Sequence, residues 1–202
     1  FPVWKDKGEP GDHLEDLLAE EAAAWLGEPR EEPFYLAYWA FEVHNPWQAK
    51  EEQVDHFRAK AKPGAPQRHR VYAGMIQSLD LAVGRLVAAL EESGQLDDTL
   101  IVFLSDNGGV SRSCETPVMP AEFHGVPITS NAPLRSGKGS LYEGGVRVPL
   151  IVSWPGRMRP GSTSAAIVTG TDWFPTLLEI LAIPSPPGLE FDGASFAPAL
   201  EG

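Results

Sequence analysis

The stretch TLIVFLSDNGG, residues 99–109, decides the fold class. Residues 99–104 are mostly apolar and rich in β-branched and aromatic side chains, which is typical of a short buried strand. Residues 105–109 combine small polar side chains with two glycines, and this predicts a turn directly at the end of the strand. In α/β folds, ligands bind beyond such strand ends. The turn is therefore the first place to look for chemistry.

On both sides of this strand, helix and strand patterns alternate. Apolar residues recur at helical spacing over 12–26 and 68–93, and a short helix is expected over 172–181. Apolar runs at 34–40 and 148–154 predict two further strands. This alternation predicts an α/β fold with a mostly parallel sheet flanked by helices.

Three acidic residues receive structural interpretations. Asp12 and Asp172 stand where helices begin and are expected to be N-caps. Asp80 falls on the apolar stripe of the long helix, so we expect it to be buried and to accept hydrogen bonds from backbone or from an arginine.

Composition excludes several classes of protein. The 202 residues include 16 Lys and Arg against 28 Asp and Glu, so the net charge is -12, and 43% of residues are hydrophobic. Such a chain is not disordered, and its acidity argues against a nucleic-acid partner. A single cysteine, Cys114, excludes an internal disulfide framework and a cysteine-rich zinc site. We also expect no transmembrane segment and see no secretory signal pattern at the N-terminus.

Asp106 and Asn107 are the first candidate ligands. A carboxylate beside a carboxamide suits a hard cation such as Ca²⁺ or Mg²⁺ better than zinc. The alternative is an ordinary Asp-Asn-Gly turn. Because Ca²⁺ takes about 6–8 oxygen ligands, further ligands must come from elsewhere if these two residues bind a metal.

His44 follows the apolar run 34–40 and so belongs to the same predicted sheet edge as Asp106. An imidazole there can donate a proton to a leaving group, although a histidine satisfied by local hydrogen bonds is the alternative. The remaining histidines are expected at the surface. His124 differs only because it lies within the long loop 110–132, where we expect substrate specificity to reside.

Lys138 stands between Gly137 and Gly139, which allows an anion to approach both the ammonium and the backbone. The segment is not a P-loop, because Gly139 follows the lysine and Ala132 occupies the position of the first glycine. A solvated lysine on a flexible loop is the alternative interpretation.

Together these segments resemble the formylglycine-dependent, arylsulfatase-like sulfatase family of the alkaline-phosphatase-like superfamily. The resemblance covers nearly the whole chain, and the joint occurrence and order of the motifs are specific. The matching stretches are 37–48, 72–85, 101–109, 133–156, 171–177 and 192–196.

The resemblance implies a sulfuric ester hydrolase that acts on a small-molecule or carbohydrate sulfate ester. Asp106 and Asn107 would be ligands of Ca²⁺, or alternatively of Mg²⁺. Lys138 would contact the sulfate, and His44 would hydrogen-bond it and help to protonate the leaving oxygen. His124 is a candidate for substrate binding. Many members of the family are exported, so the resemblance favours a periplasmic, extracellular or lysosomal location.

The family's nucleophile is a formylglycine made from Cys or Ser in a Cys/Ser-x-Pro-x-Arg motif. Cys114 does not fit that motif. Ser153 to Arg157 spells it, but after the lysine segment, where the family has a Trp-Pro-Gly turn, so we interpret the match as coincidence. Residues 1–202 are thus expected to be a partial catalytic domain, without the N-terminal nucleophile-bearing part and the C-terminal subdomain, and to be inactive alone.

Two alternatives stay open. One is a phosphodiesterase or phosphonate hydrolase of the same superfamily. Those enzymes often bind two metals through additional His and Asp ligands, and the Asp106–Asn107 pair favours one metal. The other is a truncated, non-catalytic domain. The particular sulfate ester, the Cys or Ser origin of the nucleophile and the oligomeric state do not follow from the sequence.

Overall fold

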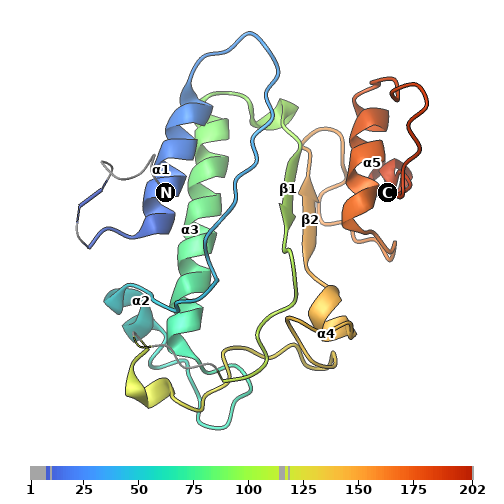
Figure 1. Cartoon of the computed structure of the whole chain (residues 1–202). Helices are drawn as coiled ribbons and strands as arrows, with labels where there is room; N and C mark the ends of the chain where they lie inside the picture. Colours follow the sequence, from blue (N-terminus) through green and yellow to red (C-terminus); the bar gives the residue numbers. More distant parts are fainter. Residues whose placement is uncertain (1–7, 10, 114–116, 118, 202) are drawn as a thin grey trace. The chain divides into compact units, whose positions relative to one another are not determined.

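A computed structural model describes residues 8, 9, 11–113, 117 and 119–201. The chain divides into two compact units. The first comprises Phe1–Leu96 and Leu104–Pro149, and the second comprises Asp97–Phe103 and Leu150–Gly202. Figure 1 follows the order of the elements along the chain.

The first unit is built on two long helices that lie side by side (Figure 1). The longer one forms because apolar residues recur at helical spacing. It begins after His69, whose Nδ1 accepts the N–H of Tyr72 at 3.3 Å, and it ends before Gly94, where φ is +71°. The elements of this unit are α1 (Leu14–Gly27), α2 (Glu51–His56), α3 (Arg70–Glu92), the 3₁₀ turn η3 (Ala121–Phe123) and α4 (Glu143–Val146).

The second unit holds a two-stranded sheet and a short helix. The N–H of Ser105, just after the first strand, donates to the carbonyl of Pro149, just before the second, at 3.4 Å. The end of one strand therefore lies beside the start of the other, and the pair is antiparallel. The strands are β1 (Ile101–Leu104) and β2 (Leu150–Ser153). The other elements are α5 (Trp173–Ile180), α6 (Ala197–Glu201) and the 3₁₀ turns η2 (Leu96–Asp98, which begins in the first unit) and η4 (Gly170–Asp172).

The core of the first unit joins α3 to two loop regions that follow or precede it in the chain. Six buried residues form one cluster: Trp47, Val71, Met75, Met119, Phe123 and Ile128. Val43 and Val110 are partly buried against the same cluster. Burial of each large apolar side chain contributes about 1.5–3 kcal/mol. The cluster therefore holds both residues 43–47 and the loop after β1 against α3.

The predicted helices and strands are confirmed at 12–26, 68–93, 99–104, 148–154 and 172–181, each within a few residues of its observed bounds. The strand predicted at 34–40 is wrong. This segment is extended and its side chains alternate between half-buried and exposed. In the described part of the chain, however, the only strands are β1 and β2. A strand needs a neighbouring strand to pair with, and none of the described residues provides one for the segment 34–40.

Of the three predictions about acidic residues, one is confirmed in position and two need correction. Asp12 is not the N-cap of α1, because His13 holds that position and Asp12 Oδ2 accepts the N–H of Glu9 at 2.6 Å. Asp172 is the N-cap residue of α5, as predicted, but its carboxylate accepts the N–H groups of Thr169 and Ala194 instead of one from α5. Asp80 is exposed rather than buried.

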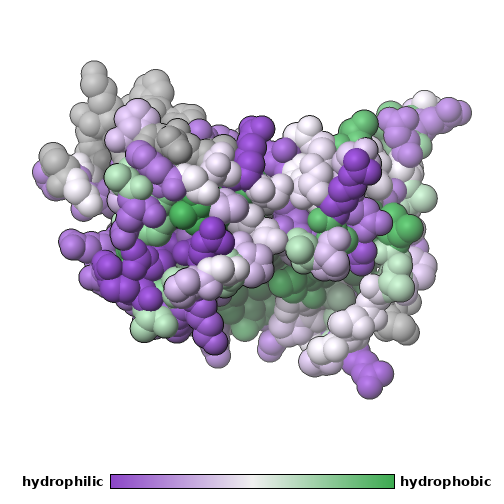
Figure 2. Space-filling model, turned by 90° about the horizontal axis from the view of Figure 1, so that it is seen from below, coloured by the Kyte–Doolittle hydropathy of each residue, from purple (hydrophilic) through white to green (hydrophobic). Residues whose placement is uncertain are grey.

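By length and composition alone, α3 is apolar enough to cross a membrane. The same helix packs against α1 and α2 and buries Val71, Met75 and Ala82. Large hydrophobic side chains also reach solvent elsewhere, as one face of the molecule illustrates (Figure 2).

Candidate functional site

The turn after β1 is held against a second loop by contacts between glycines. The N–H of Gly108 donates to the carbonyl of Gly145 at 3.0 Å. A Cβ at Gly108 would lie 1.8 Å from the carbonyl oxygen of Gly144, so only glycine fits there. Asp106 is exposed at this turn, and Asn107 beside it is half-buried. We call residues 105–111 and 131–145 the glycine platform.

Asn131 fastens the two halves of the glycine platform with its carboxamide. Its Oδ1 accepts the N–H of Gly109 at 3.1 Å, while its Nδ2 donates to the carbonyls of Gly109 at 2.8 Å and Ser136 at 3.1 Å. Sequence reasoning assigned no role to Asn131. Nothing in its spacing marks it, because the contact spans 22 residues.

Lys138 is attached directly to the turn that carries Asp106 and Asn107. Its backbone N–H donates to the carbonyl of Gly109 at 3.0 Å. At Gly137 a Cβ would lie 2.3 Å from that same carbonyl oxygen, and Gly139 has φ of +87°. The Lys138 side chain is exposed, and the part of the chain that the structure describes offers it no ion pair. Its ammonium is thus available to an anion.

His44 closes a tight turn at residues 41–44. Its N–H donates to the carbonyl of Phe41 at 3.1 Å, and its Nδ1 lies 3.0 Å from the carbonyl oxygen of Asn45. Because a carbonyl only accepts, Nδ1 carries the hydrogen and Nε2 is left for another partner. The ring is exposed.

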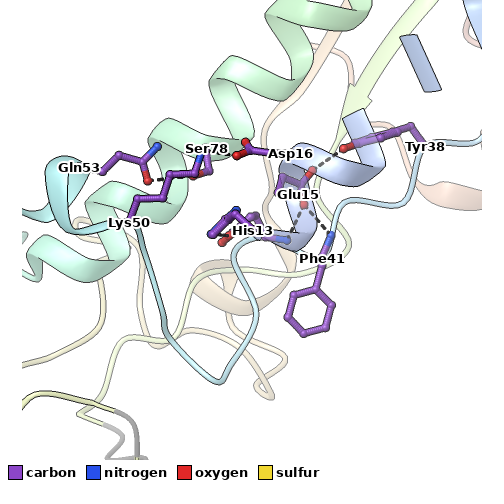
Figure 3. Close-up of polar contacts among 9 residues, drawn as sticks. His13, Glu15, Asp16, Tyr38, Phe41, Lys50, Gln53 and Ser78 are labelled. Atoms are coloured by element: carbon purple, nitrogen blue, oxygen red, sulfur yellow. Dashed lines mark hydrogen bonds and ion pairs between the residues drawn. The ribbon is translucent and has the colours of Figure 1, made fainter. Parts of the chain in front are cut away.

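Behind this turn lies a buried acidic cluster contributed by α1 and the segment 38–42 (Figure 3). The Glu15 side chain, on a residue that is 1% exposed, accepts the Tyr38 hydroxyl at 2.6 Å and the N–H groups of Phe41 and Glu42 at 3.1 and 3.3 Å. Burial, together with the hydrogen bond to Glu15, raises the pKa of Tyr38. The phenol therefore stays a donor.

Glu42 and His13 form a neutral pair beside Glu15. Burial, with the charges of Glu15 and Asp16, raises the pKa of Glu42 to about 8, although Lys50 opposes the shift. Burial also lowers the pKa of His13. Because both shifts favour uncharged forms at pH 7, the 3.3 Å contact from His13 Nε2 to Glu42 Oε1 is a hydrogen bond from a carboxylic acid rather than an ion pair.

All five candidate site residues lie in the first unit. Backbone hydrogen bonds join the segments of Asp106, Asn107 and Lys138 within the glycine platform. Among the described residues, the segment of His44 meets the platform at the hydrophobic cluster, against which Val43 and Val110 both pack. His124 follows Phe123 of that cluster, is exposed, and has no described contact with the other four.

Two further sequence features concern the family's nucleophile: the motif-like stretch from Ser153 to Arg157, and Cys114. Ser153 ends β2, and the residues after it form a tight turn in which the N–H of Arg157 donates to the carbonyl of Trp154 at 3.1 Å. Ser153 and this turn belong to the second unit. Cys114 lies outside the described residues.

The donors present fit a hard cation only in part. Asp106 and Asn107 supply a carboxylate and a carboxamide oxygen, and no described residue bonds to either side chain. Among the residues that the structure describes, no three His, Cys, Asp or Glu side chains group to hold a metal. The pair therefore suits Ca²⁺ or Mg²⁺ chemically but needs ligands from outside the described set.

Comparison with known proteins places this chain in a family. The sulfatase family model matches residues 2–183, so the chain belongs to the sulfatase family. The solved structure of Ps i-CgsB in complex with k-i-k-neocarrahexaose is similar, with a TM-score of 0.78 and 31% identity over 96% of this chain and 40% of that one. The PsFucS1 sulfatase from Pseudoalteromonas sp. has a TM-score of 0.71 and 28% identity over 94% of this chain and 34% of that one. The chain thus carries part of the alkaline-phosphatase-like α/β fold, as predicted, although the two strands that the structure describes are antiparallel and not parallel.

Curated relatives are similar over most of this chain. A sulfatase of Formosa agariphila is 35% identical and covers 98% of this chain, which matches 35% of that protein. The steryl-sulfatase of Mus musculus is 36% identical and covers 92% of this chain, which matches 27% of that protein. The chain therefore spans 27–35% of the length of these relatives.

Proposed function

We propose that the protein to which these residues belong hydrolyses sulfate esters. What supports this, beyond membership of the sulfatase family, is the backbone bond from Lys138 to Gly109. It joins an exposed ammonium to the turn that bears a carboxylate and a carboxamide, within one unit. Such a combination suits a tetrahedral anion that is bound together with a cation.

In this proposal Lys138 and His44 act on opposite ends of the bond that breaks. Lys138 neutralises negative charge on the sulfate oxygens, which increases in the transition state. With both ring nitrogens protonated, His44 donates the Nε2 proton to the leaving oxygen and keeps the hydrogen on Nδ1. The bond from Nδ1 to the carbonyl of Asn45 orients the ring for that transfer.

Asp106 and Asn107 would hold the divalent cation, Ca²⁺ or Mg²⁺, with further ligands from outside residues 1–202. When bound, the cation supplies positive charge beside the sulfate oxygens. The nucleophilic oxygen is proposed to come from a formylglycine, also outside these residues. Residues 1–202 alone are therefore expected to show no turnover.

The substrate proposed is a carbohydrate or small-molecule sulfate ester. Similar proteins include one solved with k-i-k-neocarrahexaose, a steryl-sulfatase and an N-acetylgalactosamine-6-O-sulfatase. A panel of an aryl sulfate, a sulfated carrageenan oligosaccharide and a steryl sulfate would separate these classes. An exported protein is expected, as in our interpretation of the sequence.

Replacement of Lys138 tests the proposal. In the full-length protein Lys138→Ala should lower kcat/KM for 4-nitrophenyl sulfate by about 10²–10³-fold with little change in Tm, because the lost ammonium acts mainly in the transition state. Lys62→Ala, at another exposed lysine, is the matched control. An unchanged rate in Lys138→Ala would remove the lysine from the site. Faster cleavage of a phosphodiester than of the sulfate would favour the phosphodiesterase alternative.

The cation is tested by binding rather than by turnover. Calcium at 100 times its Kd should stabilise the full-length protein by about 2.7 kcal/mol, measured as a rise in Tm. Asp106→Ala should abolish that rise, because the carboxylate is the only charged donor at the turn, and Asp80→Ala, at an exposed carboxylate of α3, should preserve it. An equal rise in all three proteins would show that calcium binds elsewhere.

A further inference from the structure

Glu15 stands out because it is a buried carboxylate on the packing face of a helix. The residue is 1% exposed, and Ala19, one turn further along α1, is equally buried. Transfer of an ionised carboxylate out of water costs several kcal/mol unless hydrogen bonds replace the water. Apolar residues in such positions are often as stable or more so. The carboxylate therefore invites an explanation other than stability.

The hydrogen bonds of Glu15 converge on one segment of chain. Oε1 accepts the Tyr38 hydroxyl, while Oε2 accepts two backbone N–H groups in succession, those of Phe41 and Glu42. Figure 3 shows the carboxylate between Tyr38 and the backbone of Phe41. Two consecutive N–H groups on one oxygen fix the orientation of the peptide plane between them as well as its position.

This segment has few other backbone attachments. Residues 34–40 are extended, and no described backbone hydrogen bond pairs them with another strand. The next bond along the chain is the one that closes the turn, from the His44 N–H to the Phe41 carbonyl at 3.1 Å. Glu15 thus holds the N–H of Phe41, and the carbonyl of that same residue holds His44.

We propose that Glu15 is a positioning residue that acts through the backbone of Phe41 to orient the His44 imidazole. This inference rests on the proposed function, because it assigns Glu15 to the proton-donating side of that site. The side chain of Glu42, the second residue of the Phe41–Glu42 peptide, contacts His13 Nε2 of the α1 N-cap at 3.3 Å. Glu15 itself makes no contact with substrate in this proposal.

The test replaces Glu15 in the full-length protein by residues that keep or remove the acceptor. Glu15→Gln keeps an oxygen for both N–H groups and has a similar size. Glu15→Leu removes the acceptor, and Glu15→Met does so with an unbranched side chain, should leucine disturb the packing. Glu20→Leu, an exposed position on α1 whose ion pair with Arg85 is on the surface, is the matched control.

Two measurements are made on each variant. Hydrogen exchange, followed by mass spectrometry of peptides that span 38–45, reports how firmly the turn is held. The kinetic constants for 4-nitrophenyl sulfate report the orientation of His44. We expect Glu15→Leu and Glu15→Met to exchange at least about tenfold faster in this segment and to lose about 30–100-fold in kcat, with KM changed less than about threefold. Glu15→Gln and Glu20→Leu should stay within about threefold of the parent protein in both measurements.

The outcomes separate this inference from the proposed function. Unchanged exchange in folded Glu15→Leu or Glu15→Met would overturn the role of Glu15, as would faster exchange with unchanged kcat. Failure of Glu15→Gln to restore both measurements would do the same. If the parent protein hydrolyses no sulfate ester, the proposed function fails, and the exchange rates still decide whether Glu15 holds the turn.

Discussion

The glycine platform and the His44 turn present functional side chains by opposite means. In the platform, backbones approach so closely that side chains are excluded, and Asp106 and Lys138 project outward from glycine-lined contacts. At the turn, a buried carboxylate reaches across from α1 to hold two peptide N–H groups. The platform depends on glycines that have no Cβ, whereas the turn depends on the buried carboxylate of Glu15 as a hydrogen-bond acceptor. The first should therefore fail when atoms are added, and the second when charge or acceptors are altered.

Addition of one methyl group to the platform should have the largest effect. Gly108→Ala places a Cβ 1.8 Å from the Gly144 carbonyl oxygen, and the atoms that it meets in Gly144 and Gly145 are all backbone atoms, which cannot rotate away. We expect kcat/KM of the full-length protein to fall by more than about 100-fold, because displacement of these loops by about an ångström moves Asp106 and Lys138 together.

Gly84→Ala is the matched control for this substitution. Nothing lies within 4 Å of a Cβ at Gly84, which is exposed in α3. Alanine there should raise stability by about 1 kcal/mol, since glycine is a poor helix former. Thermal unfolding and kinetics of both variants provide the measurement. Equal behaviour of the two would refute the requirement for close approach.

Removal of the Asn131 carboxamide should have the next largest effect. Asn131→Ala loses three hydrogen bonds within the platform and leaves the backbone of Gly109 unpaired on that side. We expect a loss of about 2–3 kcal/mol in the free energy of unfolding, measured with urea. Asn131→Asp, which keeps the acceptor and loses the donors, should fall between alanine and the parent protein. A neutral Asn131→Ala would mean that the glycine contacts suffice.

Glu42→Gln should have a smaller effect that depends on pH. The folded-state pKa of Glu42 is raised to about 8 from an ordinary 4.5, so its contribution to stability is complete below about pH 4.5 and is lost as pH rises toward 8. Glutamine stays neutral. The stability of Glu42→Gln relative to the parent should thus increase by up to about 1 kcal/mol per pH unit across that interval.

Urea unfolding at pH 5, 6.5 and 8 checks this prediction. Glu32→Gln, at an exposed carboxylate, is the control and should follow the parent protein at all three values. Titration of His13 is common to the proteins and largely cancels in the difference. A constant difference between Glu42→Gln and the parent would contradict a buried, neutral carboxyl.

Local patterns predicted the elements but not their partners. The helices and the two strands follow from apolar spacing, which residues close in the chain determine. The run 34–40 has strand composition, yet strand formation needs a neighbour, and composition does not supply one. Likewise the stripe of α3 suggested a buried Asp80, whereas the buried carboxylate of this helix pair is Glu15 of α1. Periodicity identifies a face, but the packing partner determines which charged residue is covered.

The candidate site residues could be located from their positions at strand ends, but the contacts that hold them in place could not. Asp106, Asn107, His44 and Lys138 were selected as polar residues in turns, and their roles stay predictions. The hydrogen bonds from Lys138 and Asn131 to Gly109 join positions at least 22 residues apart. No spacing rule anticipates such contacts, because they depend on how loops fold back. The glycines hinted at them, since paired glycines often mark close approach.

The segment from Phe34 to Phe41 has a practical consequence for handling the protein. Its eight residues carry no charge, glycine or proline, and Tyr35 and Trp39 are 83% and 88% exposed. Uncharged, aromatic stretches of this length are the material from which cross-β fibrils form. Production of residues 1–202 therefore calls for a low protein concentration or a solubilising fusion partner. Thioflavin fluorescence, which reports cross-β fibrils, would show whether Tyr35→Lys reduces fibril formation.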